Sequence, residues 1–414
     1  MTWEAFFELK ILLCKIKKIL NTILSKIEIL IMSKLLNLMR SIREKIRRYL
    51  HLHVWLISGT ELHSGEHFTI LYAGNRLSKN YIVNLIFGDE YDEIELGMKW
   101  LKNNFRIAKL AKQKIQDCSM MILEVNERLH NLIKRKKDFY IPLRVRGEVD
   151  IPLTVSNSSV KSDMIKIRKN NLTLEVTTEK SQFDKFYHDM YLPYMRYRHG
   201  NRLLALGYNE LMRHWESGTC ELLLIKKDNE HIAGQVILFE ENSPRLLTLG
   251  IKDGNPCYLK YGAGAACYYL ASSYLAKRGY TSLHLGGSRA FLKDGVLQFK
   301  KRRGLRLISK SKEGFLVKPL SPSPGLKGFF LRNPFICTHR GRLHAAIFVE
   351  DDEVYSCDES LDDLCKNYYL NGLSKVNIYP LEVNGSNPKR GVSSAFSDKI
   401  TMRSVDHMHA PASR

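Results

Sequence analysis

The sequence predicts an α+β protein whose central unit is a mixed β-sheet flanked by helices. Two observations predict this class. Short apolar stretches typical of antiparallel strands occur between residues 172 and 252, and a long helical stretch and one further strand then follow, up to residue 285. The length of 414 residues, with 44% hydrophobic and 26% charged residues, is that of a globular protein with two or three domains. Two strands connected through a helix run parallel, so the sheet is expected to be mixed.

Residues 1–50 are expected to form a basic amphipathic helical segment. They carry eleven Lys and Arg residues against four acidic residues, and apolar residues recur at helical spacing from Leu9 to Ile27. No uninterrupted apolar stretch there reaches the roughly 20 residues that span a bilayer. Such a helix can lie on an anionic membrane surface, pack on its own protein or pack on a partner's helix. A start codon assigned too early, with the true start at Met32 or Met39, is another alternative.

Residues 51–160 are expected to form an N-terminal α/β region. Phe68–Gly74 and Tyr81–Gly88 are apolar stretches of strand length, Glu93–Ile133 is interpreted as mostly helical, and Tyr140–Val145 returns to a strand. No pattern in this range points to chemistry. We expect it to cover one side of the central domain or to shape that domain's substrate groove.

The central domain is expected to span residues 161–318 and to begin with antiparallel strands and two helices. Leu172–Val176 alternates as a strand does, and Ser181 is a candidate cap for a helix that runs through Met190. Pro193 is expected to end or bend that helix and to expose the residues around it, up to His199. His199 can act as a base near neutral pH or cap the helix through a backbone carbonyl, and both interpretations stay open. A second helix and a hairpin follow: Tyr208–Trp215, then Glu221–Lys226 and Ile232–Phe239 around Asp228–Glu230.

A strand, a glycine-containing loop and a helix then form a candidate anion site. Leu246–Lys252 is the strand, and Ala263–Lys277 is helical, with Gly279 as its expected C′ residue. Amide groups at the start of a helix point outward and bind phosphates. Gly262 and Gly264 would allow close approach of such a ligand, and Lys260 would add a positive charge. Tight packing of a helix start on a sheet is an equal alternative.

The next strand, Ser282–Leu285, runs directly into Gly286 and Gly287. Two glycines at a strand end let the backbone approach a ligand closely, because no Cβ stands in the way. Arg289, Asp294 and Lys300 follow and place both signs of charge beside this opening. The basic run that starts at Lys300 can attract an anionic substrate.

Residues 319–383 are expected to form a small C-terminal α/β unit, and residues 384–414 a disordered tail. After the linker Pro319–Gly325, the pattern predicts a strand at 341–349, a helix at 361–369 and a strand at 376–381. Eight cysteines without paired spacing indicate a reduced, cytoplasmic protein. The Cys and His residues lack the regular spacing of metal ligands, so no metal site is predicted. The net charge of +21 favours anionic partners, which are phosphorylated small molecules, nucleic acid or anionic lipid.

The range from Asp163 to Leu307 resembles the acyltransferases of the GNAT superfamily, and most closely their exopolysaccharide- or cellulose-biosynthesis-type branch. Two blocks carry the resemblance. Tyr187–Tyr194 with Arg198–Gly200 is similar to the first-helix signature of that branch, and Gly286–Arg289 with Asp294–Gly295 and Phe299–Lys300 is similar to its last signature. Leu259–Gly264 lies where the superfamily carries a Gln/Arg-x-x-Gly-x-Gly/Ala coenzyme A loop. Leu259 occupies the Gln or Arg position of that loop, so the side-chain contact made there is lost.

The resemblance implies a GNAT-like sheet and an acyl-CoA-dependent N- or O-acyltransferase, most simply an acetyltransferase. The implied cofactor is acetyl-CoA or another acyl-CoA, and the acceptor is an amine or hydroxyl of a small or sugar-like substrate, in polysaccharide biosynthesis. Asp294 and His199 are candidates for the general base, and Arg289 and Lys300 would position an anionic substrate or the cofactor. The candidate cofactor-binding residues are Leu249, Gly250 and Ile251, which would polarise the thioester carbonyl between splayed strands, and Lys260, Tyr261, Gly262, Ala263, Gly264 and Ala265, which would hold the pyrophosphate.

Two alternatives remain at this point. Fem-type transferases are distantly similar to the same branch and take their donor group from aminoacyl-tRNA, which suits a basic surface. The second alternative is a degenerate transferase fold that serves, without catalysis, as a membrane-surface or scaffold module. The departure at Leu259 motivates this alternative. Residues 1–50 would then provide the contact with an anionic membrane and associate an otherwise cytoplasmic protein with it.

Overall fold

A computed structural model describes residues 51–100, 118–133, 137–154, 157–200, 205–240, 243–350, 358–381 and 400–402. The expectations for residues 1–50 therefore lie outside the described residues. Most of the range 384–414 does as well. Within that range Ile400–Met402 forms strand β17, so the expectation of a disordered tail is corrected there.

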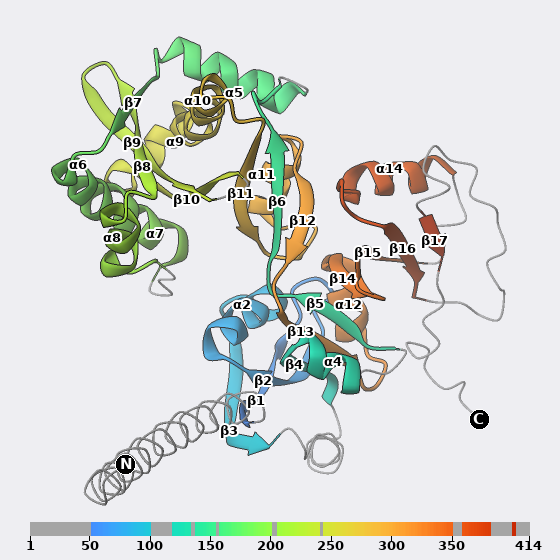
Figure 1. Ribbon diagram of the computed structural model, residues 1–414. Coiled ribbons are helices and arrows are strands. Elements are labelled where there is room, and N and C mark those ends of the chain that lie inside the picture. The colour runs from blue at the N-terminus through green and yellow to red at the C-terminus, as the bar shows by residue number, and fades with distance from the viewer. Residues whose placement is uncertain are drawn as a thin grey trace, which may run out of the picture.

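The chain forms three β-sheets with helices packed around them, which confirms the α+β class and the mixed, helix-flanked sheet (Figure 1). The first sheet has six strands, in the order β3 (Tyr91–Trp100), β1 (His51–Thr60), β2 (His67–Gly74), β4 (Cys118–Asn126), β13 (Glu313–Pro319) and β5 (Phe139–Pro142). Strands β2 and β4 are its parallel pair, and the other neighbours are antiparallel.

The second sheet has seven strands, in the order β12 (Arg306–Lys310), β6 (Val145–Asp150), β11 (Ser282–Ser288), β10 (Pro244–Ile251), β9 (Glu230–Phe239), β8 (Cys220–Lys227) and β7 (Thr173–Thr177). The hairpin β8–β9 turns at Asp228, whose positive φ of 55° suits an Asp in a tight turn. Strands β10 and β11 are parallel because helix α10 (Ala263–Lys277) connects them. The hairpin and α10 were both expected from the sequence.

Two chain segments pass from one of these sheets to the other, so that consecutive strands of each segment lie in different sheets. Strand β5 lies in the first sheet and β6, three residues later, in the second, while β12 lies in the second sheet and β13 in the first. Strand β6 pairs antiparallel with β12, and β5 pairs antiparallel with β13. Since β5 continues into β6 and β12 into β13, the four strands form one continuous antiparallel ribbon, two strands wide, that joins both sheets (Figure 1). The expected domain boundaries at 160/161 and 318/319 stay predictions. Strands from both sides of 160/161 share a sheet, and β13 itself runs across 318/319.

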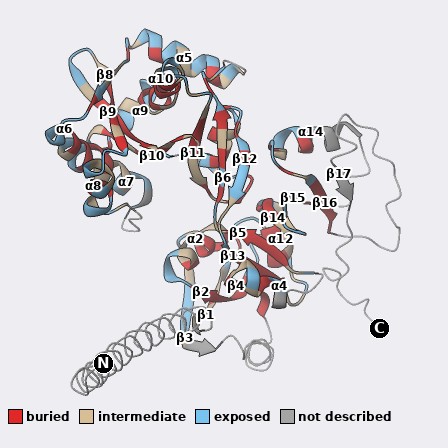
Figure 2. Cartoon of the chain, viewed as in Figure 1, coloured by how far each residue is buried: buried red, intermediate tan, exposed pale blue. Residues whose placement is uncertain are grey.

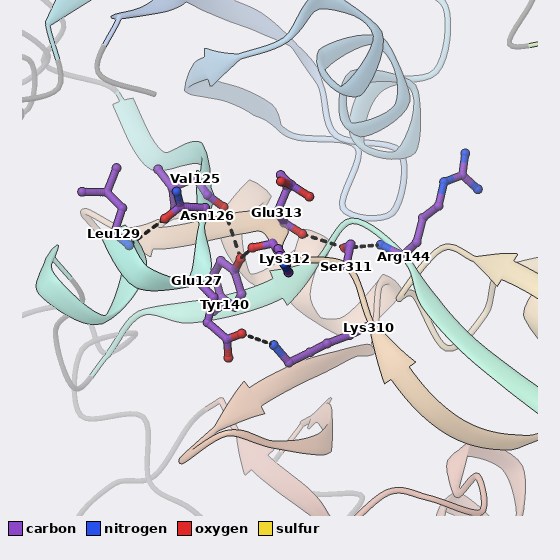
Figure 3. A network of polar contacts seen from close by, with 10 residues as sticks. All are labelled: Val125, Asn126, Glu127, Leu129, Tyr140, Arg144, Lys310, Ser311, Lys312 and Glu313. Atoms are coloured by element: carbon purple, nitrogen blue, oxygen red, sulfur yellow. Dashed lines mark hydrogen bonds and ion pairs between the residues drawn. The ribbon is translucent and has the colours of Figure 1, made fainter. Parts of the chain in front are cut away.

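Polar contacts hold the ribbon at the crossing. The Arg144 amide donates to the Ser311 hydroxyl at 3.0 Å, and the Ser311 amide donates to the Arg144 carbonyl at 2.9 Å. The Tyr140 hydroxyl donates to the Lys312 carbonyl at 2.9 Å, and Lys310 pairs with Glu127 (Figure 3). These contacts keep the ribbon continuous where the chain passes from one sheet to the other.

Two expected elements in residues 51–160 were wrong. Tyr81–Gly88, expected as a strand, belongs to helix α2 (Arg76–Phe87), whose start is capped by the side chain of Asn75 accepting from the Leu77 amide. Its buried residues follow helical spacing: Lys79, Ile82, Val83, Ile86 and Phe87. Of Glu93–Ile133, expected as mostly helical, residues 101–117 lie outside the described residues. The others instead form most of β3, then β4 and the short helix α4 (Glu127–Ile133). Strand β4 is buried on both faces and so lacks the alternation of a half-exposed strand.

The helices around the second sheet are α5 (Ser158–Lys169), α6 (Lys180–Lys185), α7 (Leu192–His199), α8 (Tyr208–Glu216), α9 (Pro256–Lys260) and α11 (Gly295–Lys301). Helix α6 begins after Glu179, so Ser181 lies inside the helix and the expected cap is corrected. A π-helical turn, Phe186–Tyr191, connects α6 to α7. Pro193 lies in the first turn of α7, where its missing N–H costs nothing, so the helix does not end there as expected.

The third sheet has the order β14 (Phe335–His339), β15 (Arg342–Val349), β16 (Lys375–Pro380) and β17. Helix α14 (Asp358–Tyr368) precedes β16, and α12 (Pro324–Arg332) packs beside β15. The two strands and the helix expected in 319–383 are confirmed.

A continuous apolar core joins the three sheets. Buried residues follow the strands of all of them (Figure 2). Phe139 of β5 packs against Phe330 of α12, against Phe335 and Phe348 of the third sheet, and against Tyr379, with ring centroids 5.4–5.7 Å apart. Among the residues described, no helix combines the length and apolar character required to cross a bilayer.

Candidate functional site

Strands β10 and β11 separate soon after they meet. Their parallel register has a single aligned pair, Arg245 with His284. Each strand carries an irregularity just beyond that pair, between Leu246 and Thr248 in β10 and between His284 and Gly287 in β11. In the described part of the chain, β10 then pairs with β9 alone, so its other edge opens toward β11. Ligands of open α/β sheets bind at such carboxyl ends of parallel strands.

The predicted carbonyl-polarising residues lie on this part of β10. Leu249, Gly250 and Ile251 pair with Gln235, Gly234 and Ala233 of β9. Gly250 also has a packing role, because a Cβ there would lie 2.7 Å from the Tyr191 amide nitrogen of the π-helical turn. The glycine is thus required for close contact with that turn, whether or not a substrate binds.

The structure leaves fewer backbone amides available in the predicted phosphate loop than the sequence indicated. The amide of Tyr261 donates to the Cys257 carbonyl at 3.3 Å and the amide of Gly262 to the Leu259 carbonyl at 3.0 Å, so neither is available to a ligand. Gly262 adopts a φ of 93° as the N-cap of α10 and is buried. The amides of Ala263, Gly264 and Ala265 form the first turn of α10, where a helix provides no intrahelical partner.

Helix α5 covers one side of this loop. A Cβ on Gly262 would lie 3.0 Å from the Cβ of Lys166, and the Asn170 side-chain amide donates to the Tyr261 carbonyl at 3.2 Å. Lys260 and Tyr261 are exposed, and the Lys227 ammonium lies 5.8 Å from the Tyr261 ring centroid. The surface beside the first turn of α10 is therefore strongly basic.

Beyond the opening, β11 bulges at Gly286 and Gly287, and Lys300 of α11 holds this bulge, the Gly286–Gly287 turn, from inside. Lys300 is 3% exposed, and its ammonium donates to the Gly287 carbonyl at 3.0 Å and to the Gly286 carbonyl at 3.4 Å. Burial lowers the pKa of Lys300 from 10.5 to about 8, against the attraction of Asp294. The Gly286 amide donates to Nδ1 of His284, a histidine whose pKa burial lowers to about 4. His284 is thus a neutral imidazole at the point where the strands part.

Arg289 lies between the sheets rather than on one of them. Its guanidinium carbon is 4.0 Å from the ring centroid of Tyr81 in α2. Backbone bonds to the third sheet fix the segment that carries it, because the Ile336 amide donates to the Ala290 carbonyl at 2.7 Å and the Leu292 amide to the Pro334 carbonyl at 2.8 Å. All three sheets therefore contribute to the surroundings of Arg289.

Asp294 begins helix α11. Its Oδ1 accepts from the Leu297 amide at 2.9 Å, which is an N-cap contact. Asp294 attracts both Lys300 and Arg289, so three predicted site residues lie in one electrostatic cluster. Its second carboxylate oxygen has no hydrogen bond to the described residues and is the proton acceptor that the cluster offers.

His199 is the remaining predicted residue. Its backbone ends α7, and its side chain lies outside the described residues, so its role as a base stays a prediction. Tyr191, expected to be exposed near Pro193, is instead 3% exposed, and its hydroxyl accepts from the Leu206 amide at 2.8 Å. Tyr197 is 53% exposed, as expected.

Two residues of the cluster were missed. Tyr81 was interpreted as part of a strand, and Arg144 as part of a short strand without chemistry. Arg144 packs over the turn, because a Cβ on Gly287 would lie 3.2 Å from the Arg144 Cδ. Neither residue is close in sequence to the glycine turn, so no local pattern could have found them.

In comparisons with known proteins, the chain matches solved structures but no family model and no curated sequence. Among solved structures it is similar to L-PGS from Bacillus licheniformis, with 10% identity, a TM-score of 0.32, and coverage of 68% of this chain and 85% of the other. It is similar to FemX, with 13% identity, a TM-score of 0.33, and coverage of 61% and 81%.

A GCN5-related N-acetyltransferase from Kribbella flavida shows 11% identity and a TM-score of 0.27, with coverage of 58% of this chain and 93% of the other. Since likeness at this level carries no argument about activity, the α+β class rests on the strand order of this chain. The exopolysaccharide branch stays a prediction.

Proposed function

We propose that this protein is an acyltransferase that moves an acyl group from coenzyme A to an amine or hydroxyl of a small acceptor, with an acetyl group as the simplest case. The observation that carries the proposal is the opening between β10 and β11 beyond the Arg245–His284 pair. The donor carbonyl would lie in this opening. Unpaired backbone amides on the free edge of β10 would stabilise the oxyanion that forms when the acceptor attacks.

The donor's diphosphate would lie at the first turn of α10. Ala263, Gly264 and Ala265 offer three amides there, and exposed Lys260 adds a positive charge. Because α10 follows the carboxyl end of β10 and Gly286 and Gly287 lie near the carboxyl end of β11, diphosphate and acceptor would lie at the same edge of the sheet. Asp294 would accept the acceptor's proton as the nucleophile attacks, with His199 as the other candidate base.

Gly264→Asp is expected to abolish the increase in melting temperature that acetyl-CoA causes in the wild type. A carboxylate in the first turn repels a diphosphate, yet it interacts favourably with the helix dipole, so the fold should not suffer. Gly264 suits the substitution, since a Cβ there meets the flexible Leu259 side chain at 3.2 Å, whereas Gly262 has a left-handed φ. Differential scanning fluorimetry is the measurement.

Gly264→Ala is the matched control and should keep the acetyl-CoA response. Turnover would be followed with labelled acetyl-CoA and a panel of amines, amino sugars and nucleotide sugars. A wild type whose melting temperature does not respond to acetyl-CoA, and which labels no acceptor, would refute the proposal and leave the aminoacyl-tRNA and the non-catalytic alternatives.

A specific observation favours aminoacyl-tRNA as a second candidate donor. Five exposed cationic side chains lie on α5 and beside the start of α10, and none forms an ion pair with a described carboxylate: Lys161, Lys166, Arg168, Lys169 and Lys260. Such a surface suits a phosphate backbone.

If tRNA is the donor, binding of tRNA should weaken steeply with salt. Replacing all five cationic residues by glutamine should lower the slope of log K against log salt concentration by roughly 3.5 units, at about 0.7 per contacted phosphate. Filter binding at several salt concentrations measures the slope. An unchanged slope, or no binding of tRNA by the wild type, would exclude this donor.

A further inference from the structure

Arg289 is held against an aromatic ring and has no ion-pair partner among the described residues. Its guanidinium stacks on the Tyr81 ring at 4.0 Å, and it forms no hydrogen bond and no ion pair with the described residues. It is only partly exposed. Removing a cation from water without a partner is costly unless a ligand supplies the missing charge. The contact with Tyr81 restrains the guanidinium plane while leaving its N–H groups available.

Arg144 is a second guanidinium at the same place. Its backbone is clamped to Ser311 through two hydrogen bonds, and its stem packs over Gly287. Figure 3 shows its side chain extending away from the polar network of the ribbon. Arg144 is exposed and also lacks a described carboxylate partner. The Arg144 stem contacts Gly287, and Arg289 follows two residues later, so both cations belong to one region. In accord with this, burial and then the Arg144 charge lower the pKa of Arg289.

The nearby carboxylates, Glu124 and Asp294, form no ion pair with either arginine among the described residues. Glu124 accepts from the Tyr72 hydroxyl at 3.0 Å and from the Asn75 amide at 2.8 Å. Asp294 accepts from the Leu297 amide, and Lys300 is turned toward the Gly286 and Gly287 carbonyls. The exposed side of the cluster is therefore positive. A mobile anion can satisfy both guanidinium groups where the fixed carboxylates do not.

We propose that Arg144 and Arg289 together bind an oxyanion, a carboxylate or phosphate, carried by the acceptor, and that Tyr81 is the positioning residue for Arg289. The inference rests on the proposed function, which it deepens by naming the chemical class of the acceptor. Guanidinium groups suit this ligand because their planar N–H pairs match carboxylate and phosphate oxygens. It also gives the first sheet a role, since Tyr81 and Arg144 come from that side of the molecule.

The test measures binding without turnover. Isothermal titration of inorganic phosphate and of acetate into the full chain is expected to show a site that Arg144→Gln weakens about 10-fold or more, as loss of a charge-assisted hydrogen bond does. Arg144 is exposed, so this variant should fold even if Arg289→Gln does not. Tyr81→Phe should keep the affinity because the ring remains, and Tyr81→Leu should lower it.

Gly264→Asp separates this proposal from the proposed function. It should abolish the acetyl-CoA response and leave the phosphate site intact. Phosphoethanolamine, β-alanine and ethanolamine then distinguish a phosphate source, a carboxylate source and a neutral acceptor. The proposal is overturned if Arg144→Gln binds phosphate and acetate as the wild type does, or if ethanolamine is acylated as well as its two anionic analogues while acetyl-CoA still binds.

Discussion

Lys300→Met should remove a pH dependence of stability that the wild type shows between pH 8 and pH 10.5. Burial lowers the pKa of Lys300 to about 8 in the folded protein, while an unfolded lysine stays near its ordinary value. Between these values the unfolded state binds one more proton than the folded state, so this lysine makes stability rise with pH. Below pH 8 the cost of the buried charge is fully present.

The measurement is urea unfolding of wild type and Lys300→Met at pH 7.5 and pH 9.5. The difference in unfolding free energy between the two proteins should change by about 2 kcal/mol over this interval, in favour of the wild type at the higher pH. Tyrosines and other lysines titrate in both proteins and cancel in that difference. A difference that does not vary with pH would mean that Lys300 titrates normally.

Lys300→Met should also lower kcat/KM about 100-fold, because the Gly286–Gly287 turn loses the ammonium that holds its carbonyls and Arg289 is displaced with it. Lys301 is the matched control. Burial lowers its pKa to about 8 as well, but its ammonium donates to the Lys366 and Asn367 carbonyls at the end of α14. Lys301→Met should change stability with the same pH sign and leave turnover unaffected.

Gly314→Ala should destabilise both the six-stranded and the seven-stranded sheet together. Gly314 lies in β13, and a Cβ there would approach the Tyr140 ring to 2.6 Å and the Ile141 carbonyl oxygen to 2.7 Å. Backbone cannot move aside as a flexible side chain can, so we expect a loss of about 3 kcal/mol. Because the ribbon joins the sheets, hydrogen exchange in β2 and in β9 should accelerate alike.

Gly295→Ala serves as the control for Gly314→Ala, because a Cβ on Gly295 meets nothing within 4 Å. Its effect should stay within about 1 kcal/mol. If Gly314→Ala accelerates exchange in β2 and leaves β9 protected, the two sheets unfold separately and the ribbon does not couple them.

Local patterns predicted several elements well. The hairpin β8–β9 was expected because a polar turn separates two apolar runs. Helix α10 was expected because helical spacing ends at Lys277 and Arg278, just before Gly279, whose φ is 88°. Local patterns failed at β4, where burial on both faces removed the period of two, and at α2, where an apolar run hid the Asn75 cap. In each failure, the surroundings of the segment outweighed its own periodicity.

The same distinction holds for the candidate site. The glycine turn and its charged residues Arg289, Asp294 and Lys300 were predicted from one short segment, and the structure brings them together. In the predicted phosphate loop, the amides from Tyr261 to Ala265 were candidate donors, and the local backbone bonds of Tyr261 and Gly262 leave three of them. A sequence pattern indicates which residues can adopt a turn, but not which backbone N–H groups are hydrogen-bonded within that turn.

By itself, the sequence determined the α+β class, the strand–helix–strand crossover through α10 and the charge beside Gly286 and Gly287. These depend on residues near one another in the chain, whose spacing reflects local geometry. Only the tertiary structure decided that β6 joins the second sheet and β13 the first, and that the Lys300 ammonium is buried. It also placed Tyr81 against Arg289 and Arg144 against Gly287. Contacts between residues so far apart depend on how whole sheets pack, and nothing in a local pattern specifies that packing.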